Sequence, residues 1–67
     1  YGKLEVVYRG LLKSKPNSPQ YHASYAVVLA QLGKIDSAII EAKRAAELDK
    51  SFEAEARAFV QALGRQW

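Results

Sequence analysis

The stretch Leu32-Gly33-Lys34-Ile35-Asp36-Ser37-Ala38-Ile39 decides how this chain folds. Gly33 directly follows an apolar residue, which is the position at which a left-handed glycine ends an α-helix. Asp36 is a residue type that caps the start of a helix, so we expect it to open the next one. Apolar residues recur at helical spacing on both sides of the stretch. The stretch therefore predicts two consecutive helices joined by a short turn.

Two more breaks flank this pair of helices. The run Lys13-Ser14-Lys15-Pro16-Asn17-Ser18-Pro19 contains two prolines and predicts a turn. Ser18 is expected to cap the next helix, with the second proline at its first position, where a missing N–H costs nothing. The run Asp49-Lys50-Ser51 predicts the last break, because Glu53 and Glu55 behind it suit a helix N-terminus. These breaks divide the chain into four helical segments.

Each segment carries an apolar stripe at helical rather than strand spacing. The stripes are Tyr1, Leu4, Val7, Tyr8, Leu11 and Leu12; His22, Tyr25, Ala26, Leu29 and Leu32; Ile35, Ala38, Ile39, Ala42 and Ala45; and Ala56, Phe59, Val60, Leu63 and Trp67. The connections are short, so consecutive helices should pack antiparallel. We therefore predict an all-α fold, an antiparallel array of helical hairpins.

Length and composition limit what the chain can be. Its 67 residues make one small domain or a piece of one, which excludes a multidomain enzyme. Apolar residues are 49% of the chain, so it should fold rather than remain disordered. With no cysteine and a single histidine, His22, there is no basis for a disulfide framework or a zinc site. We expect no metal and no cofactor.

The compartment stays open between the cytoplasm and a bacterial envelope. No apolar run approaches the roughly 20 residues of a membrane span, so we expect a soluble segment, although the parent protein could be membrane-attached. The chain begins with Tyr1 and has no leader-like stretch, so we expect a fragment of a longer protein.

A shift of about 34 residues superimposes the chain on itself weakly. The shift pairs Leu4 with Ala38, Tyr8 with Ala42, Leu11 with Ala45, Tyr25 with Phe59, Ala26 with Val60 and Leu29 with Leu63. Only the last pair is identical. The apolar class and the phase of the turns recur, which is typical of a structural repeat.

The central segment resembles a tetratricopeptide repeat. The resemblance is carried by Tyr25-Ala26, Leu29, Leu32-Gly33-Lys34-Ile35-Asp36, Ala38-Ile39, Ala42, Ala45 and Leu48. It implies one complete repeat over 19–52, preceded by the second helix of another repeat over 1–16 and followed by a C-terminal capping helix over 53–67. The complete repeat departs from the family pattern at four positions: His22 replaces a Trp, Ala26 a Gly, Ala42 an aromatic residue and Lys50 a Pro. In the preceding segment, Leu4 stands where the family has a small residue.

The sequence contains no motif typical of an enzyme active site. The glycines form no phosphate-binding loop, and no serine lies in a nucleophile motif. His22 falls on the apolar stripe of its helix, so we expect it to pack rather than act as a general base. We expect Glu41, Glu47 and Asp49 to serve as a solvated face and as helix-end contacts. The sequence therefore predicts a protein that is not an enzyme.

The net charge of +3 raises the question of nucleic-acid binding. The basic residues are scattered over the segments instead of forming one stripe, and the aromatic residues belong to the apolar seams. Solvated faces are therefore the preferred interpretation of the charges. A weakly basic nucleic-acid accessory domain stays open as an alternative function.

The resemblance implies a non-catalytic scaffold that binds a protein or peptide on the concave face formed by the first helix of each repeat. Carried over by position, this face comprises Gln20, Ala23, Ser24, Val27, Ala30 and Gln31, joined by Ala54, Arg57, Ala58 and Gln61. The basic and Asn residues with which one subfamily binds acidic C-terminal tails are missing at Ala23, Ser24, Val27, Ala54 and Ala58. A helix or extended peptide suits this face better. The alternative is that these small residues only let neighbouring repeats stack.

The two ends of the chain differ. The fourth segment opposes its apolar stripe, which ends at Trp67, with polar residues, as a solvating cap requires. The first segment lacks an N-cap and a partner helix, which would leave an apolar patch. The second alternative function is therefore homo-oligomerisation through a face of Tyr1, Leu4, Tyr8 and Leu11.

Overall fold

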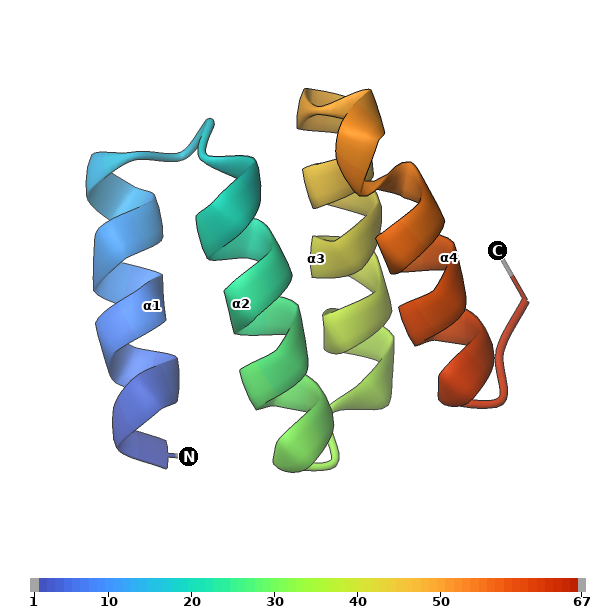
Figure 1. Ribbon diagram of the computed structural model, residues 1–67. Helices are drawn as coiled ribbons and strands as arrows, with labels where there is room; N and C mark the ends of the chain where they lie inside the picture. Colours follow the sequence, from blue (N-terminus) through green and yellow to red (C-terminus); the bar gives the residue numbers. More distant parts are fainter. Residues whose placement is uncertain (1, 67) are drawn as a thin grey trace.

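Four α-helices and one 3₁₀ turn follow one another in the computed structural model, which describes residues 2–66. The helices are α1 (Gly2–Ser14), α2 (Pro19–Gln31), α3 (Ile35–Leu48) and α4 (Glu53–Ala62), and the 3₁₀ turn η1 (Lys50–Phe52) precedes α4. Consecutive helices run antiparallel, and α3 lies between α2 and α4 (Figure 1). No strand occurs within the described residues. The all-α array of helical hairpins is confirmed.

The turn between α1 and α2 forms as the sequence predicts. Ser18 has an extended backbone, with φ −92° and ψ 108°, and its hydroxyl accepts a hydrogen bond from the backbone N–H of Tyr21 at 3.4 Å. Pro19 is the first residue of α2, where its fixed φ suits the helix. The serine thus satisfies one of the N–H groups that the first turn of a helix leaves unpaired.

The turn between α2 and α3 is closed by Gly33, whose φ of 81° lies in the left-handed region. This conformation lets the backbone N–H of Lys34 donate to the carbonyl of Leu29 at 2.9 Å. The prediction that Asp36 caps α3 is wrong. The chain re-enters the helix directly after the glycine, so Lys34 occupies the cap position and no side chain caps the helix. Asp36 lies in the first turn, where its charge still favours the helix dipole.

The break before α4 is organised by Asp49. Its carboxylate accepts hydrogen bonds from the hydroxyl of Ser51 at 2.8 Å and from the backbone N–H of Ser51 at 3.0 Å. The hydroxyl contact is the main cause that lowers the pKa of the Asp49 carboxyl below its ordinary value. The prediction of helix-end contacts for Asp49 is therefore confirmed.

The fourth helix ends earlier than the sequence stripe suggests. It stops at Ala62, and Gly64 turns the chain with a φ of 78°. The segment behind it is tied back to α3, because Arg65 Nη1 lies 3.6 Å from Asp36 Oδ1. Trp67, which ends the predicted stripe, lies outside the described residues.

Small side chains make up the core. One buried cluster joins three helices through Ala26, Ala42, Ala46, Ala56 and Val60, with Ile39 and Phe59 packed against it. Ala38 is 0% exposed and Ala45 is also buried. Because alanine keeps little bulk between helices, the axes of α2 and α3 can approach closely. The predicted stripe of α3 is thereby confirmed as the buried side of that helix.

α1 packs on α2 and is also tied to the turn behind α2 by an ion pair. It contains no buried residue. Glu5 accepts a hydrogen bond from Lys34 Nζ at 2.6 Å, which ties the start of α1 to the turn between α2 and α3. The Lys34 contact lowers the pKa of the Glu5 carboxyl below its ordinary value, while burial raises it to a lesser degree. Three apolar side chains of α1 are exposed: Leu4, Val6 and Val7.

The alanine packing gives a testable expectation for stability. Ala38→Leu adds three carbon atoms at a site with no exposed surface, so it should lower the free energy of unfolding by about 1–3 kcal/mol. Ala58→Leu is the matched control, because Ala58 is exposed on α4. Urea unfolding followed by circular dichroism measures both variants. Equal stability of Ala38→Leu and the parent chain would contradict close packing at this position.

Candidate functional site

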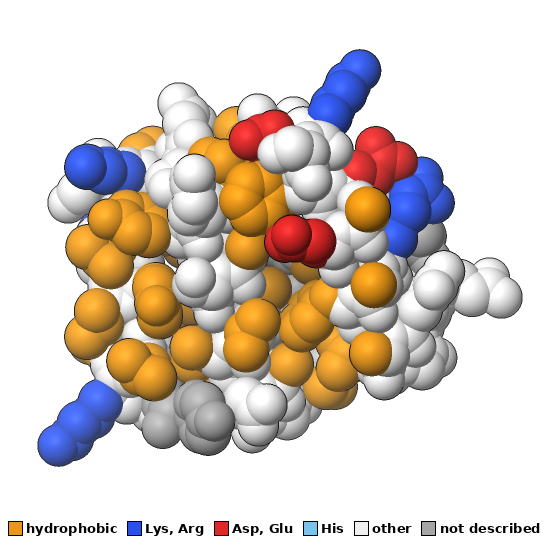
Figure 2. Space-filling model, viewed as in Figure 1, with side chains coloured by type: hydrophobic (Ala, Val, Ile, Leu, Met, Phe, Trp, Pro, Cys, Tyr) orange, Lys and Arg blue, Asp and Glu red, His pale blue; other side chains and the backbone are white. Residues whose placement is uncertain are grey.

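An apolar groove runs between α2 and α4, with α3 as its floor. We call it the α2–α4 groove; its cavity volume is about 120 Å³ and its lining consists of Ala23, Ala26, Val27, Ala42, Ala45, Phe52, Glu55, Ala56 and Phe59. Hydrophobic side chains gather on this face of the molecule (Figure 2). The hollow exists because alanines form its floor while larger side chains stand at its walls. A preformed apolar hollow with few polar groups is the usual character of a ligand site.

The structure brings some of the predicted concave-face residues to this groove. Ala23 and Val27 line it, and Val27 is 48% exposed. The other predicted residues of α2 do not line the groove: Gln20, Ser24, Ala30 and Gln31. On α4 the predicted Ala54, Arg57, Ala58 and Gln61 are exposed but also outside the lining. The α4 side of the groove is instead built from residues that the sequence did not mark as a site.

Those missed residues share one face of α4 and of the turn before it. Phe52, Glu55, Ala56 and Phe59 follow the spacing i, i+3, i+4, i+7, which places them on one side of a helix. The sequence stripe contained Ala56 and Phe59, but as core positions. Phe52 is the last residue of η1 and directly follows the predicted break Asp49-Lys50-Ser51. Extending the helical register back to position 52 would have found the set.

Among the described residues, Glu55 is the one charged residue in the groove lining. The neighbouring Glu53 is already paired, since its Oε1 lies 2.9 Å from Arg57 Nη2 and accepts a hydrogen bond from Arg57 Nε at 3.0 Å. Glu55 makes no ion pair or side-chain hydrogen bond with any residue of 2–66. In Figure 2 an acidic side chain lies near the middle of this face, and Lys and Arg side chains stand at its edges. The groove is therefore locally acidic in a chain that is basic overall.

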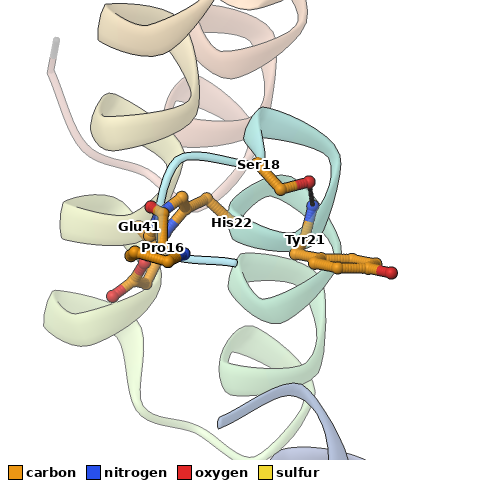
Figure 3. Close-up of polar contacts among 5 residues, drawn as sticks. All are labelled: Pro16, Ser18, Tyr21, His22 and Glu41. Atoms are coloured by element: carbon orange, nitrogen blue, oxygen red, sulfur yellow. Dashed lines mark hydrogen bonds and ion pairs between the residues drawn. The ribbon is translucent and has the colours of Figure 1, made fainter. Parts of the chain in front are cut away.

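His22 has a structural role. Its side chain is buried, with 6% of the residue exposed, and it points from α2 toward α3 (Figure 3). Nε2 lies 2.7 Å from the carbonyl oxygen of Pro16, and Nδ1 lies 2.5 Å from Glu41 Oε2. A carbonyl can only accept, so Nε2 carries a proton and donates it there. The prediction that His22 packs is confirmed, because both ring nitrogens bind partners that hold the loop and α3 against α2.

Glu41 corrects one prediction. We expected it on a solvated face, but its side chain is 17% exposed and is directed at His22. The partner lies 19 positions away in the sequence. Only the packing of α2 against α3 brings the two side chains together. Glu47, from the same expectation, is exposed as predicted.

Several basic residues form ion pairs with carboxylates of the same chain. Basic side chains paired with carboxylates within residues 2–66 include Arg9, Lys34, Arg57 and Arg65. These pairs lie on different helices and loops. In the described part of the chain, no group of three or more His, Cys, Asp or Glu side chains could hold a metal ion. No helix of that part reaches the length and hydropathy that crossing a bilayer would need.

One known protein is similar to this chain in sequence. The chain is 38% identical over 52 residues to the small glutamine-rich tetratricopeptide repeat-containing protein 2 of Mycosarcoma maydis. The match covers 78% of this chain and 15% of the relative, so the chain spans a small part of that protein's length. No protein-family model matches the chain, and no solved structure matches it.

The buried pair of His22 and Glu41 gives a second testable expectation. His22→Leu should lower the free energy of unfolding by about 1–3 kcal/mol, because it leaves the Glu41 carboxyl group and the Pro16 carbonyl without their hydrogen-bond partners on the ring. The double variant His22→Leu with Glu41→Leu should cost less than the sum of the two single variants, because no carboxylate is then left unpaired. Urea unfolding of the four proteins provides the cycle. Strictly additive costs would contradict the pairing.

Proposed function

This chain belongs to the tetratricopeptide-repeat family, and we propose that it works as a non-catalytic scaffold that presents the α2–α4 groove to a peptide or partner protein. The single observation that carries the proposal is the apolar hollow between the two helices. It is formed by backbone packing and short side chains, so a ligand would meet it ready-made. Preformed sites lose less conformational entropy on binding than sites that must be ordered first.

We also propose a division of the chain into repeat units. In this division, 19–52 is the complete unit, 1–16 is the second helix of a preceding unit and 53–67 is a C-terminal capping helix. The hairpin of α2 and α3, joined through buried alanines, supports the first part. The groove would then lie between the first helices of two successive units.

The groove can be tested with one exposed residue. Val27→Glu places a carboxylate on an apolar wall without filling any buried space, because Val27 is 48% exposed. Peptides selected from a random phage-displayed library on the parent chain should bind this variant at least about tenfold more weakly, a cost of about 1.4 kcal/mol. Helicity by circular dichroism should stay unchanged.

Val7→Glu is the matched control for that experiment. Val7 has a similar exposure of 52% but lies on α1, outside the groove. The selected peptides should bind this control as they bind the parent chain. Equal binding to Val27→Glu and the parent would remove the groove as the site, and equal weakening by both variants would point to a general effect of added charge.

A second candidate function is self-association through α1. The observation that favours it is the exposure of Leu4, Val6 and Val7 on one helix. Of the face proposed from the sequence, Leu4 is exposed and Tyr8 and Leu11 are half-buried, whereas Tyr1 lies outside the described residues. The exposed part of this face is therefore shifted toward the two valines.

Sedimentation over a concentration series tests self-association. Pairing of two copies through α1 would bring exposed Lys3 and Lys13 of one copy near the same residues of the other. Added salt screens this repulsion, so dimerisation should increase between low and high ionic strength. Val7→Glu should shift the chain toward monomer. A strict monomer at high concentration in both salts would contradict this function.

A further inference from the structure

We propose that the α2–α4 groove selects peptides in which a bulky apolar side chain stands next to a Lys or Arg, and that Glu55 is the residue that makes this choice. This inference rests on the proposed function, since it names the ligand class of the same groove. It is carried by the size of the hollow and by the position of one carboxylate.

The size of the hollow sets the apolar part of the ligand. Its volume of about 120 Å³ is close to that of cavities of roughly 150 Å³ that hold one benzene molecule. The floor consists of alanine methyl groups, and Phe52 and Phe59 stand on the α4 side. Such a hollow takes one large aliphatic or aromatic side chain, and a whole helix would have to lie above it. A single anchor residue in an apolar pocket is a common centre of binding energy in protein interfaces.

The charge of Glu55 determines which residue type in the ligand can stand next to the apolar anchor. Glu55 lines the hollow and has no ion-pair partner among residues 2–66, whereas Glu53 is occupied by Arg57. A ligand that covers the groove removes water from the Glu55 carboxylate. This loss is offset only if the ligand supplies a donor, and a cation supplies the strongest one. An acidic side chain at the same place would meet a like charge and be rejected.

The overall charge of the chain acts in the opposite direction but over a longer range. The net charge of +3 repels a basic ligand at a distance. Exposed charges further apart than about 8 Å are largely screened at physiological ionic strength. The Lys and Arg side chains visible on this face stand at its edges (Figure 2), and the lining itself contains no Lys or Arg. Inside the groove the nearest charge is therefore Glu55, and it decides the preference.

Selection from a random peptide library tests the inference on the 67-residue chain. The library is panned on the parent chain and on three variants: Glu55→Lys, Glu47→Lys and Val27→Ser, the last of which removes apolar surface from the groove lining without adding a charge. Glu47→Lys makes the same change of charge at an exposed site outside the groove lining, so it is the control for net charge. We expect the parent chain and Glu47→Lys to enrich Lys or Arg within one or two positions of a large apolar residue. Glu55→Lys should enrich Asp or Glu there instead.

Titration of one selected peptide gives the size of the effect. Glu55→Lys should weaken binding of a parent-selected basic peptide at least about tenfold. Replacing the basic residue of that peptide by Glu should weaken binding to the parent chain and restore it to Glu55→Lys. Helicity of the variants by circular dichroism excludes unfolding as the cause.

The outcomes separate this inference from the proposed function. Selected peptides that depend on Val27 but show no basic preference, or that bind Glu55→Lys as well as the parent chain, would overturn the inference and leave the groove as the site. Selection of peptides similar to this chain's own α1 sequence would also overturn the inference and would support self-association. The absence of any Val27-dependent peptide would overturn the proposed function and this inference with it.

Discussion

The structure depends on the close approach of α2 and α3, which small side chains permit. Ala26, Ala38, Ala42 and Ala45 are all buried at or near this seam. A larger residue at any of them would have to push the helices apart or distort its own rotamer. Three of these alanines, Ala26, Ala42 and Ala45, also line the α2–α4 groove, where their short side chains leave space. Stability of the hairpin and the presence of a hollow therefore have one physical cause.

The turns could be predicted because their signals are local. Ser18 before Pro19 and Gly33 after Leu32 act on backbone groups a few residues away, so the sequence contains the whole interaction. The prediction that Asp36 caps α3 was wrong, because the cap position depends on where the chain re-enters the helix after Gly33. Lys34 takes that position although lysine is a poor cap, which shows the geometry of the turn outweighing side-chain preference. The length of α4 was overestimated for a similar reason. Gly64 turns the chain before the predicted apolar stripe ends.

The site was predictable only on the side of α2. The resemblance to a tetratricopeptide repeat, carried over by position, named Ala23 and Val27, and both line the groove. Phe52 and Glu55 could not be assigned in this way, because their direction is fixed by how η1 leads into α4 and how α4 packs on α3. The contact between His22 and Glu41 was missed for the same reason. Two polar residues far apart in the sequence meet only after the hairpin has formed.

The acidic character of the groove has to be separated from the needs of the helix that carries it. Glu53 and Glu55 both lie in the first turn of α4, where either carboxylate favours the positive end of the helix dipole. Local stability thus accounts for the residue type at both positions, but it does not account for their different surroundings. Glu53 is turned to Arg57, while Glu55 shares the face of Phe52, Ala56 and Phe59 and lines the groove without a partner. The apolar floor can supply binding energy to many ligands. Among the groove-lining residues of 2–66, only Glu55 bears a charge that can distinguish one ligand from another.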